Sequence, residues 1–191
     1  PSTISAQYRN QTPETRLRYK KYDSLGNLLS SWQPGGVKTN YVWGYARSSP
    51  VAKIVNASYD SVLVALGGAT QVNNMANQPN ANVSYLDNAL RTSTSLTGAM
   101  ITTYEYNPLI GLTRETDPKR MSTTYTYDLL GRLSTVRNTN GAVVKQYCYD
   151  YAGQPAHCFI NSDVQPYQYY WSLDRTAICD IPHHQASVAL V

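Results

Sequence analysis

The stretch YTYDLLGRLSTV, from Tyr125 to Val136, contains the motif Tyr-Asp-x-x-Gly-x-Leu. The stretch KKYDSLGNLLSS, from Lys20 to Ser31, contains the same motif much earlier in the chain. A motif that returns with the same internal spacing indicates a repeated structural unit. The two copies therefore raise the question of whether Tyr-Asp is a reactive pair or a structural part.

Pairs of tyrosines mark a regular repeat in the second half of the chain. The pairs are Tyr104 with Tyr106, Tyr125 with Tyr127, and Tyr147 with Tyr149. One residue separates the members of each pair, so both rings lie on one face of a strand. The second members follow one another at intervals of 21 and 22 residues, which is the length of two strands and two turns. Turn signals NPLIG and DLLG follow the pairs, and DPKR and NTNG fall midway. The spacing predicts one antiparallel hairpin per repeat.

Each residue of the motif has a folding role. The Asp side chain can accept hydrogen bonds from the turn amides two and three residues on, Gly permits a positive φ, and Leu returns to the core face. Tyr rings opposite one another on neighbouring strands would form an aromatic ladder. We therefore interpret Tyr-Asp as structural. The motif residues are Tyr22, Asp23, Gly26, Leu28, Tyr127, Asp128, Gly131, Leu133, Tyr149, Asp150 and Gly153.

Composition supports a β-rich fold with exposed sheet. The chain of 191 residues has 17 Tyr and 1 Phe, and Tyr suits a strand with one wet face. Hydrophobic residues make up 42% and charged residues 15%, so a packed core is feasible. Lys and Arg are scattered at a net charge of +4, which is typical of a solvated surface rather than a nucleic-acid interface. No apolar run is long enough to span a membrane.

The expected fold is mainly β, with stacked antiparallel hairpins that form a curved sheet. One domain, residues 1–158, is expected to carry a small two-helix insertion at about 57–97. SYDSVLVALGG has an N-cap at Ser58 and a Gly stop, and NVSYLDNALR has an N-cap at Asn82. The linker between them is expected to be turn-like or a short helix. Residues 159–191 are expected to form a less regular C-terminal strand or tail.

The repeat resembles the YD repeat of RHS proteins, a family of large bacterial secreted or surface proteins whose repeats are related to those of teneurins. Its best copies are YDLLGRLSTVRNTNGAVVKQYCYD (127–150) and YDSLGNLLSSWQPGGVKTNYVW (22–43). YDYAGQPAH (149–157) is a decayed copy, and YNPLIGLTRETDPKRMSTTYTYD (106–128) is a fourth with Asn in place of Asp. The stretch YVWGYARSSPVAKIVNASYDSV is similar to a segment of RHS proteins from Bacteroidetes-type bacteria. The resemblance covers roughly residues 15–158.

The resemblance implies a non-catalytic, structural role. In RHS and teneurin proteins many such hairpins form a hollow β-shell, which in bacteria often encloses a C-terminal toxin domain. Four hairpins are too few to close a shell, so the chain is either a fragment of one or a short stand-alone cassette. The implied partners are further YD repeats or a toxin domain of the parent polypeptide, which would be secreted or at the cell surface. Unpaired strand edges would also permit self-association.

The ends and the cysteines support further expectations. The chain begins at Pro1 rather than Met and shows no signal peptide, so we expect a piece of a longer polypeptide. The three cysteines, Cys148, Cys158 and Cys179, are expected to be free, half-buried thiols. Cys148 and Cys158 could instead meet across a hairpin.

A carbohydrate-binding face is the alternative function. Flat aromatic rings stack on sugars while nearby amides bind hydroxyls. The candidate rings are Trp32, Trp43, Trp171, Tyr104, Tyr125 and Tyr147. Packing of these rings between strands or under the helical insertion is the simpler explanation, and the sequence favours it.

Metal binding and catalysis have little support in the sequence. Cys179, Asp180, His183 and His184 form a cluster near the C-terminus, with His157 and Cys158 further upstream. Adjacent His side chains in a strand point to opposite faces, so they are poorly placed to share an ion. The carboxylates Asp23 and Asp128 are better explained as turn caps than as a glycosidase pair. We expect no metal, no cofactor and no enzymatic activity.

Overall fold

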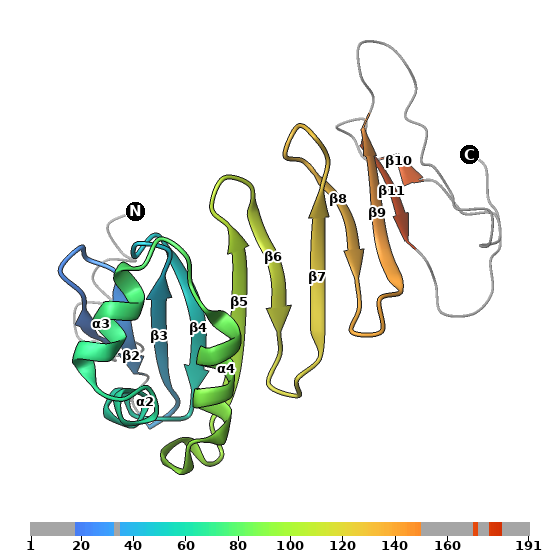
Figure 1. Cartoon of the computed structure of the whole chain (residues 1–191). Helices are drawn as coiled ribbons and strands as arrows, with labels where there is room; N and C mark the ends of the chain where they lie inside the picture. The colour runs from blue at the N-terminus through green and yellow to red at the C-terminus, as the bar shows by residue number, and fades with distance from the viewer. Residues whose placement is uncertain (1–17, 33–34, 150–169, 172–175, 181–191) are drawn as a thin grey trace, which may run out of the picture. The chain divides into compact units, whose positions relative to one another are not determined.

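The computed structural model describes residues 18–32, 35–149, 170–171 and 176–180 (Figure 1). The chain divides into two compact units, residues 1–101 and 102–191. The predicted mainly β fold of consecutive antiparallel hairpins with a helical insertion is confirmed. The expected domain end at residue 158 lies outside the described residues.

The first unit contains a four-stranded meander. Its strands are β1 (Arg18–Tyr22), β2 (Leu28–Trp32), β3 (Lys38–Gly44) and β4 (Ser49–Val55). Each strand pairs antiparallel with the next one in the chain. The side chains of β3 alternate in burial because successive residues face opposite sides of the sheet. In β4 the consecutive residues Val51 and Ala52 are both buried, at a register shift in its pairing with β3.

Three helices and a 3-10 turn follow β4. They are α2 (Tyr59–Ala65), α3 (Ala69–Asn77), α4 (Val83–Thr92) and η1 (Thr94–Leu96). The two expected N-caps are present: the Ser58 hydroxyl accepts from the Ser61 amide at 3.0 Å, and the Asn82 side chain accepts from the Tyr85 amide at 3.1 Å. The insertion has one more helix than the two that the sequence specified. The additional helix, α3, overlaps the linker at 73–81 that was expected to be turn-like or a short helix, and it begins four residues before that linker. Only Val72 and Ala76 of α3 are buried, and α3 lies against β3.

The helices cover one face of the β1–β4 sheet and enclose the core of this unit (Figure 1). Ile54 and Leu90 are completely buried, and Val42 is 1% exposed. The absence of a side chain at Gly44 permits the segment between α3 and α4 to approach β3 closely. A Cβ atom at Gly44 would lie 2.7 Å from Cγ1 of Val51 and 3.0 Å from Cβ of Ala81. The first unit therefore has a two-layer architecture of helices on a sheet.

The second unit continues as hairpins. Its strands are β5 (Met100–Asn107), which begins in the first unit, β6 (Gly111–Thr116), β7 (Ser122–Tyr127), β8 (Leu133–Arg137), β9 (Val143–Tyr149), β10 (Tyr170–Trp171) and β11 (Thr176–Asp180). Strands β5 to β9 pair in sequence order, β11 pairs with β9, and β10 pairs with β11, all antiparallel.

Burial in the second unit differs from that in the first. No helix is present among its described residues, and most side chains of β6 to β9 are half-buried. Thr103, Val136 and Cys148 are its described residues with less than 9% exposure. This part of the chain is held by its turns and strand pairing more than by a core.

No helix within the described residues is long and apolar enough to cross a membrane.

Candidate functional site

The Tyr-Asp motif forms a hairpin turn in which the Asp side chain accepts hydrogen bonds from the backbone amides of the turn. Oδ1 of Asp128 accepts from the amides of Leu130 and Arg132, both at 2.9 Å. Gly131 has a φ of 74° and donates its amide to the Asp128 carbonyl at 3.0 Å. Asp23 makes the same contacts with its own turn. The sequence analysis expected the Asp side chain to accept from the amides two and three residues further on. The first of these contacts is present, but the second is not. The amide three residues on donates to the backbone carbonyl of the Asp, and the amide four residues on donates to its side chain.

The same turn occurs at the opposite ends of the hairpins. Oδ1 of Asp117 accepts from the amides of Lys119 and Met121, both at 2.8 Å. Oδ1 of Asn138 accepts from the amides of Asn140 and Ala142 at 3.1 and 3.0 Å. The sequence indicated turns here but not their equivalence to the Tyr-Asp turn. All four turns have Asp or Asn at the first position and, three residues later, a residue with a positive φ in the left-handed region. The turn at Asp117 is hard to recognise from the sequence, because the residue at this position is Arg120, with a φ of 65°, and Arg rarely adopts that conformation.

A ring in one repeat binds a backbone carbonyl of the preceding strand. The Tyr127 hydroxyl donates to the Leu112 carbonyl at 2.7 Å, and the Tyr149 hydroxyl donates to the Leu133 carbonyl at 2.8 Å. In the first unit, Nε1 of Trp43 donates to the Leu28 carbonyl at 2.9 Å. The separations along the chain are 15, 16 and 15 residues, so Trp43 occupies the position of the repeat tyrosine. At these three positions the link joins a ring to the strand before it.

Each described Tyr-Asp or Tyr-Asn hairpin also has a register shift directly before its tyrosine. The shifts fall between Lys21 and Tyr22, between Glu105 and Tyr106, and between Thr126 and Tyr127. A bulge bends the strand and increases its local twist. Beyond the bulge, Tyr22 pairs with Leu28, and Tyr127 pairs with Leu133. The Tyr and Leu of the motif are therefore cross-strand partners at the base of the turn.

The two motif carboxylates lie in different surroundings. The Asp23 side chain is 4% exposed and accepts from Arg47 at 3.1 Å. Burial raises the pKa of Asp23, but hydrogen bonds from Asn27, Arg47 and the Leu25 amide outweigh it, and the pKa lies below its ordinary value. Arg47 belongs to the β3–β4 turn, so this ion pair joins two hairpins.

The Asp128 side chain is 26% exposed and accepts from Nε of Arg132 at 2.7 Å. Hydrogen bonds from the Arg132 amide and side chain, and from the Leu130 amide, lower the pKa of Asp128. The Arg132 guanidinium also lies 4.3 Å from the centre of the Tyr149 ring. In this hairpin the charged partner comes from the turn itself.

Residues 111–143 match the family described as RHS Repeat. The matched range covers β6, β7 and β8, and it includes the turns at Asp117, Asp128 and Asn138. No curated protein matches the chain. Among solved structures, a chain described as "Crystal Structure of TcdB2-TccC3" is similar at 14% sequence identity and a TM-score of 0.21. The match covers 73% of this chain and 6% of that one, so this chain spans a small part of that structure.

The first tyrosines of the three pairs do not form the expected ladder on neighbouring strands. Tyr104, Tyr125 and Tyr147 lie on β5, β7 and β9, with one strand between each pair. The direct cross-strand partner of Tyr104 is Glu115, and that of Tyr125 is Val136. The expectation was wrong because the tyrosine pair recurs once per hairpin, and each hairpin contributes two strands.

The Tyr125 hydroxyl lies 3.5 Å from Oε2 of Glu115. Burial raises the pKa of Tyr125, and the charge of Glu115 raises it further. Tyr125 is therefore a hydrogen-bond donor at neutral pH.

The tryptophans proposed as sugar platforms have partners of their own. Trp43 is engaged with the Leu28 carbonyl. The Arg18 guanidinium and the Lys20 ammonium lie 5.9 and 5.5 Å from the centre of the Trp32 ring. The side chain of Trp171 lies outside the described residues. Carbohydrate binding by these rings stays a prediction.

The side chains of the C-terminal Cys, Asp and His cluster, which the sequence analysis disfavoured as a metal site, lie outside the described residues, as do Asp150 and Gly153 of the motif. Within the part of the chain that the structure describes, no group of three His, Cys, Asp or Glu side chains could hold a metal ion. Cys148 is 8% exposed and disulfide-bonded. The expectation of a free thiol at Cys148 was therefore wrong. The side chains of the two other cysteines, Cys158 and Cys179, lie outside the described residues.

Proposed function

We propose that the chain is a non-catalytic structural cassette, a piece of the β-wall of a secreted or cell-surface RHS-type protein. The observation that carries the proposal is the ring-to-carbonyl link, which recurs at Trp43, Tyr127 and Tyr149. A link that recurs at three positions supports an extended array, because a repeated interface between neighbouring units is what such an array requires.

The use of polar groups in the motif supports a structural role. Both oxygens of Asp128 accept hydrogen bonds, and so do both oxygens of Asp23. The hydroxyls of Tyr127 and Tyr149 are bound to backbone carbonyls. A general base or nucleophile needs a lone pair or hydroxyl that can reach a substrate. These groups are instead used in hydrogen bonds within the hairpin turns and between neighbouring hairpins.

A deletion that preserves the phase of the repeat tests this proposal. Removal of residues 107–127 joins Tyr106 to Asp128, restores a Tyr-Asp turn, and places β5 next to β8 in the antiparallel sense. We expect a folded chain that unfolds cooperatively with a smaller denaturant m-value, since less surface is exposed on unfolding.

The matched control removes residues 107–117, which takes out one strand and reverses the direction of all that follow. We expect this variant to lose the circular-dichroism signal of the second unit. Tolerance of both deletions, or unfolding of the phase-preserving one, would show that the hairpins do not act as repeated structural units.

The proposed partners are further YD repeats or a toxin domain in the same polypeptide, and the proposed location is outside the cell. Antibodies raised against this chain should label intact producing cells or their culture medium. Labelling only after the cells are permeabilised would contradict the proposed location.

A further inference from the structure

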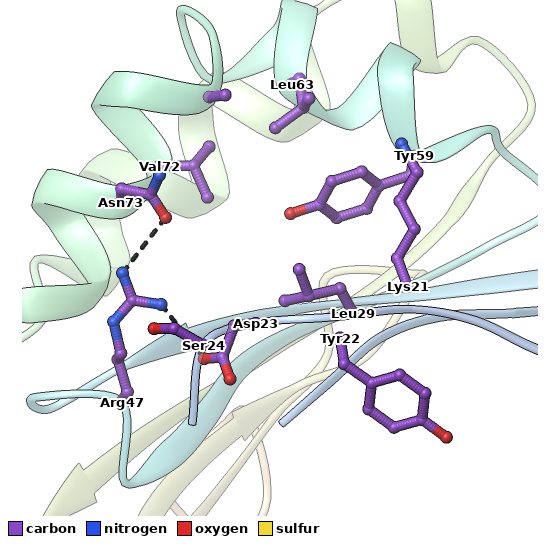
Figure 2. Close-up of a pocket in the computed structure, with 11 residues that line it drawn as sticks. Lys21, Tyr22, Asp23, Ser24, Leu29, Arg47, Tyr59, Leu63, Val72 and Asn73 are labelled. Carbon is purple, nitrogen blue, oxygen red and sulfur yellow. Dashed lines mark hydrogen bonds and ion pairs between the residues drawn. The ribbon is translucent and has the colours of Figure 1, made fainter. Parts of the chain in front are cut away.

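The first unit contains a hollow between the Tyr-Asp turn of β1–β2 and the helices α2 and α3 (Figure 2). Its volume is about 450 Å³, which is within the usual range for small-molecule sites. The hollow has an apolar part formed by Leu29 from β2, Leu63 from α2 and Val72 from α3. Tyr59 extends its ring between these side chains, with the hydroxyl directed into the open space (Figure 2).

The strong acceptors on the wall of the hollow are already used. Oδ1 of Asp23 accepts two backbone amides, at 2.9 and 2.8 Å. Its Oδ2 accepts from Nδ2 of Asn27 and from Arg47, both at 3.1 Å. Oδ1 of Asn73 accepts from Arg47 at 3.2 Å. A ligand that donates hydrogen bonds therefore finds few partners on this wall.

Donors on the same wall are left over. Arg47 uses three of its five N–H groups, toward Asp23, Asn73 and Asn77. No hydrogen bond of the Tyr59 hydroxyl is found within the part of the chain that the structure describes. Burial raises the pKa of Tyr59, and the charge of Asp23 raises it further, although Arg47 opposes this. The Tyr59 hydroxyl is therefore protonated at neutral pH and available as a donor.

Lys21 adds positive charge beside the hollow. Its ammonium lies 4.9 Å from the centre of the Tyr59 ring and 3.3 Å from Oδ1 of Asp60. The Asp60 side chain is 82% exposed, so this ion pair is weak and leaves Lys21 able to attract an anion. The side chains on the wall carry two cations, Lys21 and Arg47, and one carboxylate, Asp23.

The backbone that presents Arg47 is strained. Tyr45, Ala46 and Arg47 are consecutive residues with φ of 52°, 53° and 64°, a conformation that is costly for residues other than glycine. The amides of Ala46 and Arg47 donate to the carbonyls of Gln78 and Ala76 at the end of α3, which holds the turn in place. Backbone strain of this kind is concentrated at functional sites.

We propose that this hollow binds a small amphipathic carboxylate, with its apolar body against Leu29, Leu63 and Val72 and its carboxylate at the Tyr59 hydroxyl and the Arg47 guanidinium. The unused hydrogen-bond donors on the wall favour a head group with several acceptor atoms. The positive charge of Lys21 and Arg47 favours an anion. The apolar walls select a hydrocarbon or aromatic body over a hydrophilic one.

The test uses the full chain and the fluorescent probe 8-anilinonaphthalene-1-sulfonate, an aromatic anion that brightens in apolar sites. We expect a saturable rise in fluorescence and displacement by octanoate. Octylamine, which has the same chain with a cationic head, should displace the probe about tenfold less effectively, in line with the strength of hydrogen bonds to charged groups. Equal displacement by octanoate and octylamine would overturn the proposal.

Two matched variants locate the site. Tyr59→Phe removes only the hydroxyl and should weaken octanoate binding about tenfold. Tyr85→Phe removes the hydroxyl of a tyrosine on α4 that is 54% exposed and should leave binding unchanged. The same binding in both variants would overturn the assignment.

A third variant controls for binding of the probe to exposed leucines. Leu129 and Leu130 at a turn of the second unit are among the most exposed apolar side chains. Substitution of both by Ser should not affect the octanoate-sensitive fluorescence. Loss of that fluorescence would place the binding on the second unit and overturn the proposal.

Discussion

The same Tyr-Asp turn is built into two different surroundings in this chain. In the first unit the Asp23 side chain is 4% exposed and pairs with Arg47, 24 residues away. In the second unit the Asp128 side chain is 26% exposed and pairs with Arg132, four residues away. The amide contacts of the two carboxylates are nevertheless the same. The turn is thus a local structure that forms with or without a helical cover, whereas its contribution to stability depends on what surrounds it.

Core truncation should separate the two units most strongly. Leu90 in α4 is completely buried, so Leu90→Ala should lower the free energy of unfolding of the first unit by about 2–5 kcal/mol. Leu133→Ala removes the same atoms from a half-buried position in β8 and should cost about 1 kcal/mol. Urea unfolding followed by circular dichroism measures both. Equal losses would show that the second unit has a core as effective as that of the first.

Removal of the motif carboxylate should also destabilise the first unit more than the second. Asp23→Ala leaves Arg47 without its buried partner and should cost about 2–4 kcal/mol in the free energy of unfolding. Asp128→Ala should cost less, because water can replace the lost contacts. Chemical denaturation of both variants checks the order. A larger loss for Asp128→Ala would show that burial of the turn does not decide how much its carboxylate stabilises the fold.

Acid should weaken the Asp23 network. The pKa of Asp23 is lowered in the folded state, so its stabilising effect is complete above the ordinary pKa of 3.8 and is lost as the pH falls through the folded value. The difference in unfolding free energy between wild type and Asp23→Asn should therefore shrink from about pH 6 to about pH 3. Unfolding titrations at each pH measure it, and a constant difference would show that Asp23 is not the titrating group.

Loss of the ring-to-carbonyl link should have a smaller effect. Tyr127→Phe leaves the Leu112 carbonyl without the hydroxyl donor and should cost about 1 kcal/mol in unfolding free energy. Tyr85→Phe in α4 is the control, since that residue is 54% exposed. If the two variants are equally stable, the link does not stabilise the array.

The turn at Arg120 should respond with a small gain. Its φ of 65° is unfavourable for Arg and normal for Gly, so Arg120→Gly should raise the free energy of unfolding by about 0.5–1 kcal/mol. Gly131→Ala, at the equivalent position with a φ of 74°, should lower it by a similar amount. Thermal unfolding of both variants measures the change. A loss on Arg120→Gly would show that the Arg side chain makes a compensating contact.

Prediction from sequence succeeded where structure is local. The spacing of Tyr, Asp and Gly located the hairpins, and the side chains of Ser58 and Asn82 located two helix starts. It left the segment of α3 open between a turn-like linker and a short helix, and the packing of Val72 and Ala76 on the side of β3 accompanies the helix that forms there. It also missed that Trp43 replaces a repeat tyrosine, because the equivalence lies in the bond to the Leu28 carbonyl and not in the residue type.

The sequence by itself determined the hairpin repeat, because an Asx turn and a left-handed glycine are specified within five consecutive residues. Only the tertiary structure decided which long-range contacts the hairpins make. The ring-to-carbonyl links join residues 15 or 16 positions apart, and the hollow beside the Arg47 network brings together residues as far apart in the chain as Lys21 and Asn73. Such contacts depend on how strands and helices pack, which a local pattern does not encode.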